Sequence, residues 1–290
     1  MRRVMRRIDF IKLSPGGNTT ILVSDPARPG PGERSAIANQ LLDPLHLGGE
    51  QVGYIDLAAD PPSLMMMGGE FCGNASRSLA AVLAWKGHPS CRPGGRGLTG
   101  RVRVSGAKAP LAWRAEPSAK GFEVWVEMPT DRAATEVRDL ALEGKPLTAV
   151  FMPGICHLML PVALFPFPAL DPAGRAREIR QELGLADREA VGCVWHGGGG
   201  AAGEHRIDPV VWVRDTDSTY HETACGSGTA ALGLMLARLG DGPVAAAVRQ
   251  PSGSLISVTV SRGREGGPLD RVWIGGEVVI VAEGGAFLPD

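Results

Sequence analysis

This chain of 290 residues has few aromatic residues, no closely paired cysteines and almost no net charge. Phe, Trp and Tyr make up 5% of the chain, and the formal net charge is -1 at pH 7. This near-neutral balance predicts no nucleic-acid partner, because such partners are bound through clusters of basic residues. The 5 cysteines are scattered, and none lies in a C-x-x-C pair, which argues against a disulfide framework.

An uninterrupted hydrophobic run is missing as well. The most apolar stretch, residues 148–170, is long enough to cross a bilayer, but several prolines and a histidine interrupt it. The basic start MRRVMRR is not followed by the apolar core of a signal peptide. We therefore expect a cytoplasmic protein with no membrane partner, in which the thiols stay reduced.

Short strand-like runs separated by Gly and Pro make up most of the chain. Helical spacing is clear in only four places, at residues 33–45, 76–87, 173–184 and 228–240. This pattern predicts a β-rich α+β fold. We interpret the polar stretch at residues 130–147 as a linker between two sets of strands, and the glycine-rich stretch at residues 196–205 as the tip of a hairpin.

A sequence motif occurs once in each half of the chain. CGNASRSLAAVLAW, which begins at Cys72, aligns without gaps with CGSGTAALGLMLAR, which begins at Cys225. Both copies open with Cys-Gly and a small polar residue, and both continue as an apolar helix. The repeat predicts two pseudo-symmetric, β-rich domains, each wrapped around a central helix that starts beside a cysteine. We expect the first domain at residues 1–132, completed by a strand at 276–290, and the second at 133–275.

A cysteine at the start of a helix has an electrostatic reason to react. The free N–H groups and the positive end of the helix dipole favour an anion, so they should lower the pKa of the thiol and could also hold a carboxylate. With two such sites, a thiolate can remove a proton next to a carboxylate while a thiol delivers one to the opposite face. For Cys91, Cys156 and Cys193 we expect the simpler role of small core residues.

The motifs around these two cysteines match a known family. GEFCGNAS (69–76) and TACGSGT (223–229) resemble the two catalytic motifs of diaminopimelate epimerase and its relatives, the pyridoxal-independent racemases. SPGGNTTILVSD (14–25) resembles the segment whose asparagine contacts substrate, and GICH (154–157) takes the place of a Gly-Asn-Pro-His motif. The resemblance implies a diaminopimelate epimerase-like fold with the active site between two domains, no cofactor, no metal and a homodimer.

The departures from that family indicate a different substrate. The asparagine and arginine that hold a second carboxylate in diaminopimelate epimerase are absent, and a buried carboxylate would lack a partner. The chain more closely resembles a narrower branch, the histidine racemases of staphylopine-type metallophore biosynthesis, in which glutamates match Glu50 and Glu222. A carboxylate can accept an imidazole N–H or pair with an ammonium group. The resemblance therefore implies conversion of L-histidine to D-histidine.

The expected site combines two catalytic cysteines with a set of substrate-binding residues. The proposed acid-base pair is Cys72 and Cys225, and the expected substrate-binding residues are Asn18, Glu50, Gly73, Asn74, His157, Glu222, Gly226 and Ser227. Each binding residue also has a purely structural explanation, such as a turn, a helix start or a buried strand. Alternatives that remain open are diaminopimelate epimerase or a broad-specificity racemase, and, in another class, a redox, metal-binding or non-catalytic binding protein.

Overall fold

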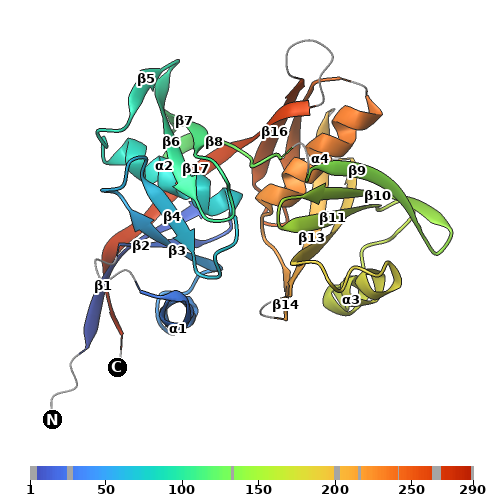
Figure 1. Cartoon of the computed structure of the whole chain (residues 1–290), viewed down its shortest axis with the longest axis horizontal. Helices are drawn as coiled ribbons and strands as arrows, with labels where there is room; N and C mark the ends of the chain where they lie inside the picture. Colours follow the sequence, from blue (N-terminus) through green and yellow to red (C-terminus); the bar gives the residue numbers. More distant parts are fainter. Residues whose placement is uncertain are drawn as a thin grey trace. The chain divides into compact units, whose positions relative to one another are not determined.

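The computed structural model describes residues 5–24, 29–131, 134–198, 203–214, 217–240, 242–262 and 269–288. They form a β-rich fold with four helices (Figure 1), and the chain splits into two compact units. Unit 1 consists of Met1–Val126 and Gly275–Asp290, and unit 2 of Glu127–Ile274. The domain boundary expected between residues 132 and 133 lies outside the described residues.

The strands of unit 1 pair in an order that returns to its starting point. β1 pairs with β2, β2 with β3, β3 with β4, β4 with β6, β6 with β7, and β7 with β8. The long last strand β17 pairs with both β8 and β1 and so completes the circuit, while β5 pairs with β6. The strands are β1 (Arg6–Pro15), β2 (Thr20–Ser24), β3 (Gln51–Asp56), β4 (Ser63–Met66), β5 (Arg92–Gly94), β6 (Gly97–Val104), β7 (Leu111–Pro117), β8 (Phe122–Glu127) and β17 (Leu269–Leu288).

The circuit of strands surrounds helix α2 (Gly73–Trp85), which contacts β1, β2, β3, β4, β6 and β7 (Figure 1). Every residue of α2 from Gly73 to Ala84 is buried, which explains the small and aliphatic residues that make up most of the helix, while its buried polar residues lie in the first half. The second helix of the unit, α1 (Pro31–Leu42), packs Ile37, Ala38 and Leu41 into the core beside β3. Unit 1 therefore holds one enclosed helix and one peripheral helix.

Unit 2 is built in a similar way around α4 (Gly226–Leu239), which contacts β9, β10, β11, β13, β15 and β16. Its second helix, α3 (Pro172–Glu182), packs against β12, β13 and β14. Parallel pairing joins β11 to β12 and β13 to β15, and the neighbouring pairs of the unit are antiparallel. The strands are β9 (Glu136–Leu142), β10 (Lys145–Met152), β11 (Ile155–Pro161), β12 (Ala190–Gly198), β13 (Glu204–Val213), β14 (Ser218–His221), β15 (Val244–Arg249) and β16 (Leu255–Arg262).

The structure confirms the four predicted helices and corrects the predicted linker. Residues 136–152 form the antiparallel pair β9 and β10 rather than a connection between units. Most residues of β9 are at least partly exposed, so its polar sequence reflects an exposed strand rather than a loop. β12 and β13 pair up to Gly198 and His205, as a hairpin at residues 196–205 requires, while the tip at residues 199–202 lies outside the described residues. No helix in the described ranges is long and apolar enough to span a membrane.

Candidate functional site

Cys72 is the N-cap residue of α2, the enclosed helix of unit 1. Its backbone is extended, with φ -134° and ψ 115°, and its Sγ accepts a hydrogen bond from Ala75 N at 3.4 Å. The carbonyl oxygen of Cys72 accepts bonds from Ser76 N at 3.0 Å and from Ser76 Oγ at 2.7 Å. The thiol is half-buried and free of any disulfide. It therefore meets the N–H groups of a helix start, as the sequence motif predicts.

A hydrogen-bonded row of side chains connects Cys72 to a carboxylate at the start of β3. Cys72 Sγ donates to Gln51 Oε1 at 2.8 Å, and Gln51 Nε2 donates to Asn18 Oδ1 and to Thr20 Oγ1. Asn18 Nδ2 in turn donates to Glu50 Oε2 at 2.9 Å. Asn18 follows two glycines with positive φ, 78° at Gly16 and 97° at Gly17, which turn the chain sharply at the end of β1. The structure thus brings the predicted residues Asn18, Glu50 and Cys72 together.

Asn74, the next predicted residue, lies in the first turn of α2 and is held by a buried arginine. Arg77 Nη2 donates to Asn74 Oδ1 at 2.9 Å and to Pro15 O at 3.0 Å. Burial lowers the pKa of Arg77 to about 10, so the guanidinium stays charged at neutral pH, and it attracts the negative charge of a Cys72 thiolate. Because Asn74 Oδ1 faces the arginine, the orientation of its amide group is fixed.

Cys225 occupies the equivalent position in unit 2, as the N-cap residue of α4. Its backbone is extended, with φ -122° and ψ 106°, and its Sγ accepts a hydrogen bond from Gly228 N at 3.2 Å. The hydroxyl oxygen of Ser227 lies 3.5 Å from the sulfur. The repeated sequence motif therefore produces the same local structure twice: a cysteine that caps a buried helix.

The expected acidity of the helix-start thiol is wrong for Cys225. Burial raises the pKa of Cys225 well above its usual value, and the nearby charge and hydrogen bond of Glu222 raise this pKa further. The bond from Gly228 N and the contact with Ser227 lower the pKa, but they do not outweigh burial. Desolvation of the anion therefore dominates over the helix start, and Cys225 carries its proton in the unliganded protein.

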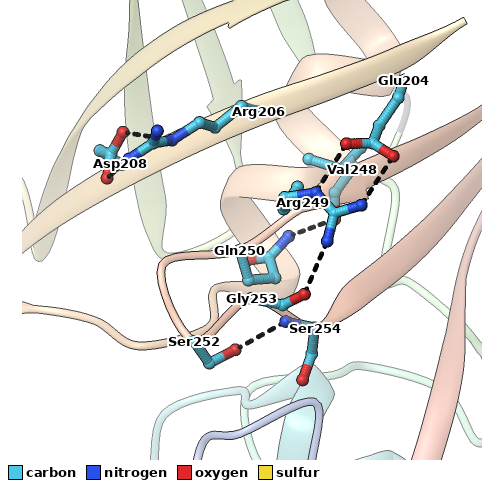
Figure 2. Close-up of polar contacts among 9 residues, drawn as sticks. All are labelled: Glu204, Arg206, Asp208, Val248, Arg249, Gln250, Ser252, Gly253 and Ser254. Atoms are coloured by element: carbon cyan, nitrogen blue, oxygen red, sulfur yellow. Dashed lines mark hydrogen bonds and ion pairs between the residues drawn. The ribbon is translucent and has the colours of Figure 1, made fainter. Parts of the chain in front are cut away.

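A glutamine that the sequence analysis did not single out supports the backbone of Cys225. Gln250 Oε1 accepts from Cys225 N at 2.9 Å, and Gln250 Nε2 donates to Thr229 Oγ1 at 3.0 Å and to Val248 O at 3.1 Å. Thr229 Oγ1 donates to Cys225 O at 2.7 Å, so both backbone polar groups of the cysteine are engaged. Figure 2 shows Gln250 at the end of β15 with its bond to Val248.

The turn that carries Gln250 is itself held in place by charged groups. Arg249 donates two hydrogen bonds to the carboxylate of Glu204, at 2.7 and 2.9 Å, and a third to Gly253 O (Figure 2). Across the turn, Gln250 N donates to Ser254 O, and Ser252 N donates to Thr223 O at 2.9 Å. The stretch from Gln250 to Ser254 therefore supports the segment that leads into Cys225.

His157, another predicted substrate-binding residue, lies in strand β11 of unit 2 and is fully buried. Burial lowers its pKa to about 3, so the ring is neutral, and neither ring nitrogen has a hydrogen-bond partner in the described part of the chain. Gly192 in the paired strand β12 leaves room for the ring, since a Cβ there would lie 2.2 Å from His157 Nδ1. The substrate role of His157 stays a prediction.

The sequence motifs identified the caps of the two helices but not the residues that hold them. Gln51, Arg77 and Gln250 each contact a predicted residue and were missed, because a single glutamine or arginine has no distinctive spacing. The one available signal was position, since Gln51 directly follows Glu50 and Arg77 lies within the repeated motif. Among the described residues, no group of three or more His, Cys, Asp or Glu could hold a metal ion.

A family model for the histidine racemase CntK N-terminal domain matches residues 7–287. The chain belongs to the histidine racemase family. A histidine racemase of Fusobacterium nucleatum is 28% identical to this family member over 295 residues, which cover 97% of each chain. A histidine racemase of Staphylococcus aureus is 28% identical over 288 residues, which cover 97% of this chain and 98% of the other.

Two solved structures have a fold similar to that of this racemase family member. A hydroxyproline epimerase from Agrobacterium vitis matches with a TM-score of 0.69 at 14% identity, over 98% of this chain and 94% of that one. A predicted epimerase from Pseudomonas aeruginosa matches with a TM-score of 0.61 at 16% identity, over 96% and 98% of the two chains. At these identities the likeness concerns the fold alone.

Proposed function

We propose that this protein interconverts L-histidine and D-histidine without pyridoxal phosphate, with Cys72 and Cys225 as the acid-base pair. The observation that carries the proposal is the paired local geometry, in which each cysteine caps a buried helix and accepts a backbone N–H bond. Membership of the histidine racemase family and full-length similarity to histidine racemases support the substrate.

In this mechanism two sulfur atoms exchange protons with one carbon. The thiolate of one cysteine takes the proton from Cα of the substrate and becomes a thiol, while the other thiol gives its proton to the opposite face of Cα and becomes a thiolate. The N–H groups at the starts of α2 and α4, with Asn74 and Ser227, would bind the substrate carboxylate and stabilise the charge that develops on it. The substrate leaves with inverted configuration and an unchanged composition.

The acidic residues fit a cationic substrate. Glu222 raises the pKa of Cys225, so an ammonium group that pairs with Glu222 would offset this charge and make the thiolate easier to form. Glu50 is exposed, and its carboxylate could accept a hydrogen bond from an ammonium or imidazole group. We further propose that His157 contributes to substrate binding, that the protein forms a homodimer, and that D-histidine serves an opine-type metallophore.

Exchange of the α-proton of L-histidine in D2O, followed by NMR and chiral chromatography, tests the mechanism. Cys72→Ser and Cys225→Ser should each lower the rate of racemisation by at least about a hundredfold, because each removes one acid-base group. Cys91→Ser is the matched control, since Cys91 is a half-buried free thiol outside the two motifs, and it should keep the wild-type rate. Exchange that persists in the double Cys72, Cys225 to Ser variant would contradict the mechanism.

The substrate is tested separately on a panel of L-amino acids that includes LL-diaminopimelate. Turnover of histidine that exceeds turnover of the other substrates is the expected result. Turnover of LL-diaminopimelate with none on histidine would assign the protein to the epimerase branch instead. Racemisation of many amino acids at similar rates would show broad specificity.

A further inference from the structure

The row of side chains from Glu50 to Cys72 has a defined direction. An ionised carboxylate only accepts hydrogen bonds, so Asn18 must turn its Nδ2 group toward Glu50 Oε2, at 2.9 Å. Asn18 Oδ1 then faces Gln51, which must present Nε2 to it. As a result Gln51 Oε1 faces Cys72 Sγ at 2.8 Å.

The last bond of this row depends on the protonation state of the sulfur. A carbonyl oxygen accepts a bond from a thiol S–H, whereas it repels a thiolate. Thr20 Oγ1, which also accepts from Gln51 Nε2 at 2.7 Å, does not fix the direction, because a hydroxyl can donate as well as accept. The negative charge of Glu50 is therefore the group that orients both amides.

We propose that ionised Glu50, acting through Asn18 and Gln51, holds Cys72 in its thiol form, so that Gln51 is a positioning residue of the reaction. The catalytic use of this thiol rests on the proposed function, but the hydrogen-bonding argument does not. The Arg77 guanidinium acts in the opposite sense, because its positive charge favours a Cys72 thiolate. The bond from Ala75 N to Cys72 Sγ also favours the thiolate, so the row of bonds from Glu50 opposes both Arg77 and the helix start.

The proposal gives substrate binding a way to change the state of the thiol. A substrate cation that takes over Glu50 Oε2 releases Asn18 Nδ2 from the carboxylate. Asn18 and Gln51 can then reverse their amide groups, and Gln51 presents Nε2 rather than Oε1 to the sulfur. An N–H donor at that position favours the thiolate, so ionisation of Cys72 becomes easier when substrate is bound.

The pH dependence of Cys72 alkylation tests the row of bonds without any need for racemase activity. Iodoacetamide reacts with the thiolate, and peptide-resolved mass spectrometry of the full chain gives the rate at Cys72 alone. Glu50→Gln should move the midpoint of this profile down by about one pH unit, because a glutamine can either donate to Asn18 or accept from it. Glu283→Gln is the matched control: it removes one exposed carboxylate of unit 1, paired with Lys86, and should leave the midpoint unchanged.

A double-mutant cycle separates the row of bonds from a direct effect of the Glu50 charge. Asn18→Ala keeps that charge but interrupts the row, so it should lower the midpoint about as much as Glu50→Gln, and the double variant should add little. Two outcomes would show that the charge acts through space and that the proposal is wrong. One is an unchanged midpoint in Asn18→Ala. The other is a protein carrying Asn18→Ala in which Glu50→Gln still lowers the midpoint by its full amount. An unchanged midpoint in the single variant Glu50→Gln would also overturn the proposal. This variant should fold normally, because Glu50 is exposed. Loss of histidine racemisation with the predicted shifts intact would contradict only the proposed function.

Discussion

At the scale of single residues, the site depends on side chains that hold the predicted ones in place. Cys72, Asn18 and Asn74 could be found from the repeated motif and the family resemblance. Gln51 and Arg77 could not, because their importance arises only when the chain brings β1, β3 and α2 together. A long-range hydrogen bond leaves no periodic pattern in a sequence, whereas a helix cap does.

Arg77 offers a test at this scale. Arg77→Met removes the donor that holds Asn74 Oδ1 in a buried position, so we expect the KM for L-histidine to rise about tenfold if Asn74 binds the substrate carboxylate. Initial rates over a range of histidine concentrations measure the change. Arg180→Met provides the control, since Arg180 is a buried arginine of unit 2 that stacks on Trp212 at 3.5 Å from the ring centroid. An equal rise in KM for both variants would indicate general destabilisation instead.

At the scale of elements, sequence periodicity located all four helices but placed each of their starts too late, including those of the two central helices. The predicted helices begin at residues 76 and 228, whereas α2 begins at Gly73 and α4 at Gly226. Glycine and asparagine are weak helix formers, so the propensity signal fades in the first turn where the capping cysteine acts. The linker prediction failed because the polar residues of β9, which suggest a loop, lie on an exposed strand.

The turn after β15 carries a prediction of its own. Gln250→Leu leaves Cys225 N without its acceptor, so the cysteine should shift, and we expect kcat to fall by about tenfold or more while KM changes little. Thr229→Val, which removes a hydroxyl bonded to both Gln250 Nε2 and Cys225 O, should behave alike. Arg206→Gln alters the neighbouring ion pair with Asp208 (Figure 2) and should leave kcat unchanged. A rise in KM at constant kcat would argue against a positioning role for Gln250.

At the scale of the whole molecule, buried thiols make stability depend on pH. Burial raises the pKa of Cys156 and of Cys193 from 9.0 to about 12. The folded protein keeps these protons while the unfolded chain loses them, so their contribution is complete below pH 9 and is lost as the pH rises toward 12. Each thiol should lower the free energy of unfolding by up to about 1.4 kcal/mol per pH unit in this window.

Urea unfolding of the protein at a series of pH values measures this effect. Cys193→Ala should reduce the slope above pH 9, although it also lowers stability at neutral pH by leaving a small cavity. Cys91→Ala is the comparison, because burial raises the pKa of this half-buried thiol less strongly. A slope that is identical in the wild type and in Cys193→Ala would show that this thiol is not the cause.

The pairing of β1 with β17 also determines the order in which the molecule can be completed during its synthesis. β1 is made long before β17, one of its two neighbours in the sheet, and unit 2 lies between β1 and the part of β17 that pairs with it. Unit 2 can therefore fold as one continuous stretch before β17 pairs with the free edge of β1. During synthesis, the circuit of strands around α2 should therefore close only after unit 2 and β17 have both been made.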